Sequence, residues 1–325
     1  MKLKTLAIIA TLGMTSVASQ AETVIRVGLA TPKTSPIYQA LEYFKNTLDK
    51  RSNGDFDVQL FPGGQLGSVN EMTELVQAGS IQMTTGASVL LSSVVPEFNI
   101  LDTFYLFKDK EQARRVLDGK GGDMLKKAME EKGLKGVGFF ERGFRDFSNN
   151  RAPLDSVESF KGLRMRAASN PTQIAAWKSI GAAPMPLNWG EIYPSLQQSL
   201  IDGQESALSS MYLEHFYEVQ KYISLTQHSY TAEVWFTNTD FWDSLSPKQQ
   251  KLLNEVAIET VSLERKLTVK ANNDALNAMK AKGLIVNEVP LKVKEALGKK
   301  MNETIKGDIV KHVGQRFYDQ FNAQL

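Results

Sequence analysis

The longest helix that the sequence predicts constrains the fold more than any other feature. Its start is marked by Ser246-Pro247-Lys248-Gln249, which offers a capping serine, a proline suited to the first helical turn and a glutamine that completes a capping box. No glycine or proline follows until Gly283. The segment is therefore predicted to form one helix of about 36 residues, roughly 54 Å long at 1.5 Å per residue. This length exceeds what a single lobe needs.

The N-terminal part of the chain alternates predicted strands and helices. Strand patterns occur at 24–30 and 56–60, and another begins at Ile81. Helix starts lie between them, at Ser35-Pro36 and at the capping box of Ser68 and Glu71. Strands that alternate with helices imply crossover connections between parallel strands. The sequence therefore predicts an α/β fold.

Shorter elements are predicted further along the chain. Residues 109–132 are expected to form two helices separated by the glycines between 119 and 122. Short strands are expected at 136–140, 222–225 and 233–238, with a turn at 226–228. The strand at 233–238 is expected to cross back into the first part of the fold.

The first 21 residues have the composition of an export signal. Two lysines precede an apolar run over 6–17, and small side chains follow at Ser19 and Ala21. We expect cleavage before Glu22, which makes the mature chain an exported protein. The apolar run is too short to span a bilayer comfortably, and no other stretch approaches about eighteen apolar residues. An N-terminal core helix is the alternative interpretation.

Charge balance and cysteine content exclude several kinds of site. The chain has 38 Lys and Arg and 36 Asp and Glu, so removal of Lys2 and Lys4 with the signal leaves 36 of each. A nearly neutral chain gives no indication of nucleic-acid binding or of a polybasic membrane patch. There is no cysteine, which excludes disulfides, thiolate metal sites and cysteine nucleophiles. About 304 mature residues are enough for two lobes.

A candidate anion site lies in the stretch from Lys161 to Glu205. Leu163-Arg164-Met165-Arg166 alternates like a strand with both arginines on one face. Asn170-Pro171-Thr172-Gln173 follows and predicts a helix start. An arginine would then lie beside the unpaired N–H groups and the positive dipole end of a helix, which favours anion binding. A solvated arginine at a strand end is the alternative.

This stretch resembles the solute-binding proteins of TRAP (tripartite ATP-independent periplasmic) transporters, the DctP-like family. The resemblance extends to the first part of the chain, through Phe61-Pro62-Gly63-Gly64-Gln65-Leu66-Gly67. The family's four central blocks occur in order as Lys161-Gly162-Leu163-Arg164-Met165-Arg166, Gly181-Ala182-Ala183-Pro184-Met185-Pro186, Glu191-Ile192-Tyr193 and Asp202-Gly203-Gln204-Glu205.

The resemblance implies a two-lobed α/β periplasmic binding protein, with a ligand cleft between the lobes and the long helix lying across both. We expect lobe I to comprise 22–144 and 232–271, and lobe II to comprise 145–231 and 272–325. The implied function is capture of a small organic carboxylate and its delivery to TRAP membrane permease subunits. The protein is expected in the periplasm as a monomer, with no metal, cofactor or nucleic acid.

Five ligand-binding residues are implied by the resemblance. Arg166 would hold the ligand carboxylate, because a guanidinium forks onto both oxygens. Arg145 would be a second ligand arginine where the chain crosses lobes, or a solvated hinge residue. Trp189 would form a wall of the cleft, or pack in the core, and Ser88 follows a strand where relatives often contact ligand. Ser206 stands where many sialic-acid and uronate binders carry asparagine, and a hydroxyl cannot replace both functions of an amide.

Two other classes of function stay open. None of the three histidines forms an H-E-x-x-H pair, and the sequence lacks the G-x-S-x-G, P-loop and G-x-G-x-x-G patterns. His228 is expected in a turn. A hydrolase built on a carboxylate pair remains the enzyme alternative, and a ligand-sensing module for a membrane receptor would share the same fold. The sequence does not identify the acid.

Overall fold

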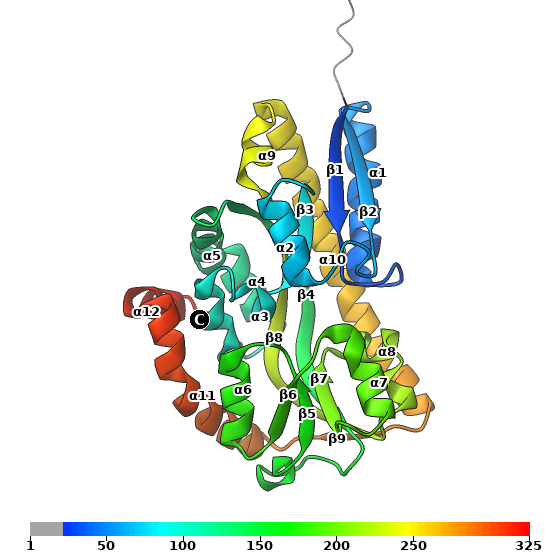
Figure 1. Ribbon diagram of the computed structural model, residues 1–325, viewed down its shortest axis with the longest axis vertical. Coiled ribbons are helices and arrows are strands. Elements are labelled where there is room, and N and C mark those ends of the chain that lie inside the picture. The colour runs from blue at the N-terminus through cyan, green and yellow to red at the C-terminus, as the bar shows by residue number, and fades with distance from the viewer. Residues whose placement is uncertain (1–21) are drawn as a thin grey trace, which may run out of the picture.

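The computed structural model describes residues 22–325, so the predicted export signal lies outside the described residues. These residues form one mixed sheet flanked by helices, which confirms the α/β prediction (Figure 1). The strand order is β2-β1-β3-β8-β4-β7-β5-β6, and β9 pairs with β8. The strands are β1 (Thr23–Gly28), β2 (Phe56–Phe61), β3 (Met83–Ala87), β4 (Leu134–Asn149), β5 (Arg164–Ala167), β6 (Ala183–Pro186), β7 (Gly203–Ser206), β8 (Tyr222–Asn238) and β9 (Ile285–Glu288).

Two long antiparallel strands, β4 and β8, run through both halves of the molecule and join them (Figure 1). At one end β3 pairs with residues 233–237 of β8, and the parallel strands β1 and β2 continue the sheet. At the other end β7 pairs with residues 146–149 of β4, and the parallel strands β5 and β6 follow. The fold therefore has two lobes that share one sheet.

The continuity of β8 shows that the predicted turn at 226–228 is wrong. Gln227 does have a turn-like φ of 48°, but pairing with β4 continues on both sides of it. The irregularity is a bulge in a long ladder, because the hydrogen bonds to a distant strand outweigh the local turn preference. His228 is consequently a buried strand residue, 2% exposed. β4 likewise extends the predicted strand at 136–140 in both directions.

Helices pack around the sheet in both lobes (Figure 1). The long helix is confirmed as a single element of 35 residues, α10, with Ser246 and Gln249 in the predicted capping box. It packs against α1 in one lobe and α8 in the other. The helices are α1 (Pro36–Ser52), α2 (Val69–Gln77), α3 (Ser88–Leu91), α4 (Lys110–Asp118), α5 (Lys120–Glu130), α6 (Pro171–Ser179), α7 (Ile192–Gln197), α8 (Leu208–Leu213), α9 (Thr239–Ser244), α10 (Pro247–Ala281), α11 (Leu291–Val313) and α12 (Gln315–Asn322).

The break between α4 and α5 is narrower than predicted. Gly119 alone separates the two helices, and Gly121 and Gly122 lie inside α5. A Cβ atom on Gly122 would come within 1.7 Å of the Leu117 carbonyl oxygen. Glycine is therefore needed here for close approach of two backbones rather than to end a helix.

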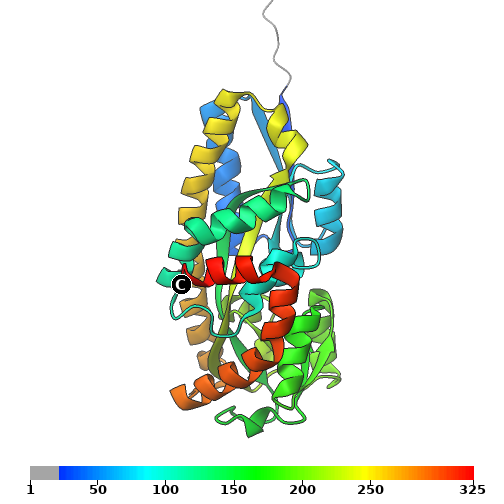
Figure 2. The same ribbon diagram turned by 90° about the vertical axis from the view of Figure 1, so that its left-hand side faces the viewer.

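The C-terminal helices connect the two lobes along one side of the molecule (Figure 2). α11 packs against α6 in the second lobe and against the 3-10 segment Pro96–Asp102 in the first. α12 then lies against α5, and Arg115 of α4 donates a hydrogen bond of 3.0 Å to the Leu325 oxygen. Within residues 22–325, no helix combines the length and the hydropathy that a membrane span requires.

Candidate ligand-binding cleft

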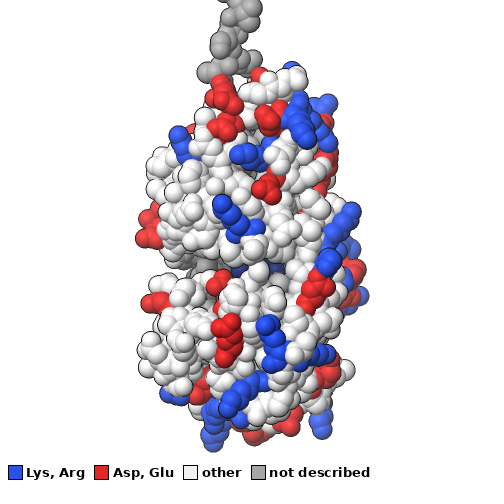
Figure 3. All heavy atoms as spheres, turned by 90° about the vertical axis from the view of Figure 1, so that its right-hand side faces the viewer, with Lys and Arg blue, Asp and Glu red and all other residues white. Residues whose placement is uncertain are grey.

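A cavity of about 680 Å³ lies between the two lobes. Its volume is within the range of small-molecule sites, and a groove crosses the middle of the molecule in the space-filling view (Figure 3). The first lobe contributes the loop after β1, the glycine turn after β2 and the start of α3, and the second contributes the loops after β5, β6 and β7. The charged residues that line it are Glu141, Arg142, Arg145, Arg166 and Glu214.

Arg166 lies on β5 and is only 5% exposed. Its Nε atom donates a hydrogen bond of 3.1 Å to the Leu187 carbonyl, and its guanidinium carbon lies 5.6 Å from the centre of the Trp189 ring. Among residues 22–325, its two Nη atoms have no hydrogen-bond partner and it forms no ion pair. Both Nη atoms of the guanidinium are thus available to a ligand.

The electrostatics of Arg166 indicate a cation that lacks a counter-ion. Burial lowers its pKa to about 10, Glu205 partly opposes this, and Arg145 adds to it. The group is still protonated at neutral pH, because a pKa of about 10 is well above neutrality. A buried cation without a carboxylate partner carries a desolvation cost. An anionic ligand would offset that cost.

Arg145 also reaches the cavity, but its guanidinium is engaged within the protein. Nη2 donates to the carbonyl oxygen and to Oε1 of Glu205, at 2.6 and 2.9 Å, and Nε donates to Oε2 of the same residue. Nη1 donates to Thr231 Oγ1 at 3.1 Å. This arginine therefore braces β4 against β7 and β8.

His228 completes this buried network from β8. Its Nε2 atom lies 3.1 Å from Glu205 Oε2, and its Nδ1 atom lies 2.8 Å from Thr226 Oγ1. Burial alone would raise the pKa of Glu205, but Arg145 and His228 lower it to about 2. Burial lowers the pKa of His228, against the opposing effect of Glu205. The network thus contains one carboxylate, one guanidinium and a neutral imidazole at neutral pH.

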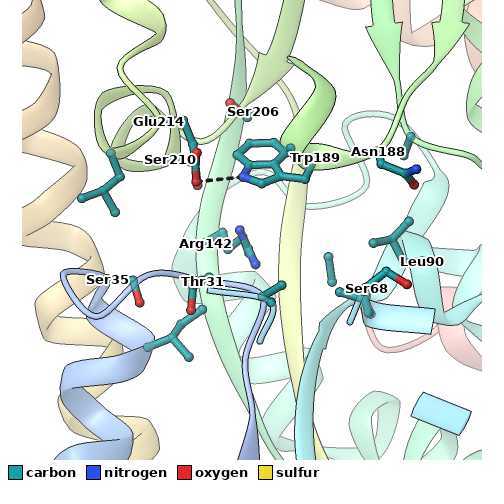
Figure 4. Close-up of a pocket in the computed structure, with 18 of the residues that line it drawn as sticks. Thr31, Ser35, Ser68, Leu90, Arg142, Asn188, Trp189, Ser206, Ser210 and Glu214 are labelled. Atoms are coloured by element: carbon teal, nitrogen blue, oxygen red, sulfur yellow. Dashed lines mark hydrogen bonds between the residues drawn. The ribbon is translucent and has the colours of Figure 1, made fainter. Parts of the chain in front are cut away.

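The other three expected residues, Trp189, Ser206 and Ser88, line two neighbouring cavities. Trp189 lines the cavity and donates from Nε1 to Glu214 Oε1 at 2.9 Å (Figure 4). Ser206 lines it too, and its buried hydroxyl has no partner among the described residues. Ser88 lies in a smaller adjacent cavity of about 20 Å³, together with Arg145. Its neighbours Ala87 and Val89, rather than Ser88, line the larger one.

Three charged residues of the cavity, Glu141, Arg142 and Glu214, were not expected from the sequence. Arg142 projects into the space between the lobes, and Glu214 faces it from the opposite side (Figure 4). Of the two arginines close together on β4, the sequence analysis named only Arg145, yet both line the cavity. The pairing of β4 with β8 turns Arg142 toward the cavity as well, and that register cannot be read locally.

Comparison with known proteins assigns the family. The model of the family described as bacterial extracellular solute-binding protein, family 7, matches residues 27–311. The chain belongs to this family. The resemblance to the solute-binding proteins of TRAP transporters and the predicted two-lobed fold are therefore confirmed.

Three members of the solute-binding family illustrate the similarity. The Escherichia coli 2,3-diketo-L-gulonate-binding periplasmic protein YiaO is 35% identical over 303 residues, or 93% of this chain and 92% of its own. The sugar acid binding protein DctPAm of Advenella mimigardefordensis, in complex with galactonate, is 28% identical with a TM-score of 0.88 and covers 93% of this chain and 97% of its own. A TRAP periplasmic solute binding protein of Sulfurospirillum deleyianum with bound succinate is 27% identical with a TM-score of 0.86, covering 94% and 100%.

A buried carboxyl group lies behind the cavity of this solute-binding protein. Glu264 of α10 is fully buried, its Oε2 accepts a hydrogen bond of 3.0 Å from the Glu141 amide, and its Oε1 lies 2.6 Å from Thr268 Oγ1. Burial raises its pKa to about 8. The folded protein therefore keeps a proton at neutral pH that the unfolded chain, with a pKa near 4.5, has released.

Glu264→Gln is expected to flatten the pH dependence of stability. Glu264 should lower the free energy of unfolding of the wild type as pH rises from about 5 to about 8, by up to about 1.4 kcal/mol for each pH unit, and the variant should lack this contribution. The glutamine of the variant can make both hydrogen bonds but does not titrate. The free energy of unfolding of the variant should therefore exceed that of the wild type toward pH 8. Chemical denaturation at several pH values measures this.

Glu259→Gln is the matched control on the same helix. Its exposed carboxylate is bonded to Arg51, which lowers its pKa, so its contribution is lost only as pH falls below the usual range. The slope between pH 5 and 8 should then stay unchanged. Parallel stability curves for wild type and Glu264→Gln over that interval would show that Glu264 is ionised in the folded protein.

Proposed function

We propose that this protein binds a small organic acid in the cleft and delivers it to the membrane subunits of a TRAP transporter. The observation that carries the proposal is the buried guanidinium of Arg166, which faces the cavity with two free Nη atoms and no ion-pair partner in the described chain. A carboxylate matches the geometry and the charge of this group. Trp189 would close one side of the bound acid by stacking beside the arginine.

The relatives support an acid as the ligand and a transporter as the partner. All the compounds named for the three relatives are carboxylates: 2,3-diketo-L-gulonate, galactonate and succinate. The solved relative from Sulfurospirillum deleyianum is described as a TRAP protein. We infer that the protein works in the periplasm as a monomer, after cleavage before Glu22, without metal, cofactor or catalysis.

Ligand capture would involve movement of the two lobes about the shared strands. The proposed lobes are 22–144 with 232–271 and 145–231 with 272–325. β4 and β8 cross between them beside the cavity, and bulges interrupt their register there. Hinge closure of two lobes around a ligand is a common binding motion. Closure would exclude water from the Arg166 contact and strengthen it.

Thermal-shift screening of the purified protein against a library of organic acids tests the proposal. A ligand at about 100 times its Kd stabilises the folded state by about 2.7 kcal/mol, which raises Tm by several degrees. Amides of the same acids serve as matched controls and should give no shift. The proposal fails if no acid raises Tm, or if acids raise the Tm of Arg166→Ala equally. Turnover of a bound acid derivative would favour the hydrolase alternative.

A further inference from the structure

The charges around the cleft are almost completely paired, and the exceptions define its two poles. Arg142 pairs with Glu233, Arg145 with Glu205, and Glu141 with Arg114. Of the charged residues that line the cavity, only Arg166 and Glu214 have no ion-pair partner in residues 22–325. One cation and one anion are thus left for the ligand.

Arg142 is turned into the cleft by a β-bulge. Glu141 and Gly143 pair with consecutive residues of β8, so Arg142 is the extra residue of the bulge, and Gly143 has a φ of 91°. Bulges next to binding sites re-aim a side chain in this way. The bulge is fixed from behind, because Asn272 of α10 donates to the Arg142 carbonyl at 3.0 Å.

The charge of Arg142 is already balanced, but its hydrogen-bonding capacity is not. Its Nε atom donates to Glu233 Oε2 at 2.7 Å, and Glu233 is completely buried. In the described chain, neither Nη atom of Arg142 has a partner. Arg142 can therefore donate hydrogen bonds to a ligand, yet it offers little uncompensated charge.

Glu214 places a negative charge opposite Arg142. One oxygen accepts from Trp189 Nε1 at 2.9 Å, and the other accepts no hydrogen bond from residues 22–325. Figure 4 shows this carboxylate beside the indole nitrogen of Trp189, with the Arg142 guanidinium below the two. Burial lowers the pKa of Arg142, but the negative charges of Glu233 and, to a smaller extent, Glu214 raise it above the ordinary value. Neither of these two acids shifts the pKa of Arg166. Arg142 and Glu214 therefore form a pole separate from Arg166.

We propose that Arg142 and Glu214 together bind a hydroxyl-bearing, uncharged end of the ligand and exclude a second carboxylate. Arg142 donates to a hydroxyl oxygen and Glu214 accepts the hydroxyl proton, while Arg166 holds the single carboxylate. This deepens the proposed function, on which it rests, by selecting a monocarboxylic hydroxy acid over a diacid. Glu214 supplies the repulsive element that such selectivity requires.

Matched pairs of acids that differ only at the far end test the inference. We choose galactonate with galactarate and erythronate with meso-tartrate, in which a terminal CH₂OH is replaced by a carboxylate. Calorimetry on the wild type should show at least one aldonate bound at least about 30-fold more tightly than its diacid, because like charges in contact cost several kcal/mol. Glu214→Gln keeps the shape and the Trp189 contact, and should reduce that ratio to within a few-fold.

Two further variants complete the test. Arg142→Lys keeps the charge beside Glu233 but loses the fork, and should weaken aldonate binding about tenfold, as the loss of a charged hydrogen bond predicts. Glu218→Gln is the control, because Glu218, like Glu214, follows α8 but accepts a hydrogen bond from Tyr193 on the surface. This variant should keep the preference of the wild type for an aldonate over its diacid.

The outcomes separate this inference from the proposed function. If acids bind through Arg166 but none of the aldonates does, the inference is wrong and the proposed function stands. It is also wrong if a diacid binds as tightly as its aldonate in the wild type, or if Glu214→Gln leaves the ratio unchanged. If binding of every acid is independent of Arg166, the proposed function itself fails.

Discussion

Arg166→Ala is expected to abolish detectable binding of any acid that the wild type binds. Removal of one partner of a buried, hydrogen-bonded charge pair costs about 2–5 kcal/mol, which is roughly 30- to several-thousand-fold in Kd. The fold should survive, because Arg166 has only one hydrogen bond of its own in the described chain. The unliganded variant should be as stable as the wild type or more stable, since an unpaired buried cation disappears. Calorimetry and thermal denaturation measure the two effects.

Two neighbouring substitutions make this expectation specific. Arg166→Lys keeps the charge but loses the fork, so it should also bind poorly. Arg164→Ala is the matched control on the same strand. Arg164 is exposed and its fork is occupied by Asp202, with Nη2 2.6 Å from Oδ1. Normal binding by Arg164→Ala is therefore expected. If Arg164→Ala loses binding and Arg166→Ala retains it, then Arg164 rather than Arg166 holds the ligand carboxylate.

The parts of the fold that were predictable are those determined by local sequence. The cap of Ser246 and the absence of helix breakers before Gly283 were enough to define α10. Asn170 and Pro171 likewise begin α6 as predicted, with Asn170 accepting from the Gln173 amide at 2.9 Å. These contacts span three or four residues, so the pattern contains all the information that they need.

The parts that were not predictable depend on distant partners. The role of Arg145 is determined by Glu205, which lies 60 residues later, and β8 is continuous because it pairs with a strand about 90 residues earlier. The arginine that faces the cavity in addition to Arg166 was expected to be Arg145, but the bulge also turns Arg142 toward it. A one-residue shift in register exchanges the faces of a strand, and one sequence does not reveal where such a shift occurs.

Glu205→Ala is expected to have the largest effect on stability. The substitution removes the carboxylate that accepts two hydrogen bonds from Arg145 and contacts His228, although the backbone carbonyl remains. A buried guanidinium would be left without a counter-ion, at a cost of about 3–5 kcal/mol, or a Tm lower by roughly 6–15 °C. The lowered pKa of Glu205 determines how this stabilisation depends on pH. The stabilisation is fully present above the ordinary carboxyl pKa and is lost as pH falls toward 2.

The double variant Glu205→Ala with Arg145→Met decides whether the unpaired charge is the cause. Methionine fills part of the space of arginine without its charge, and replacement of a whole buried pair by apolar groups is often neutral. The double variant should therefore recover much of the stability that the single variant loses, which only coupled residues can do. Asp202→Ala is the control, because it breaks a partly exposed pair with Arg164 and should cost no more than about 1 kcal/mol. If the double variant is as unstable as Glu205→Ala alone, the loss comes from packing and from His228 rather than from the charge of Arg145.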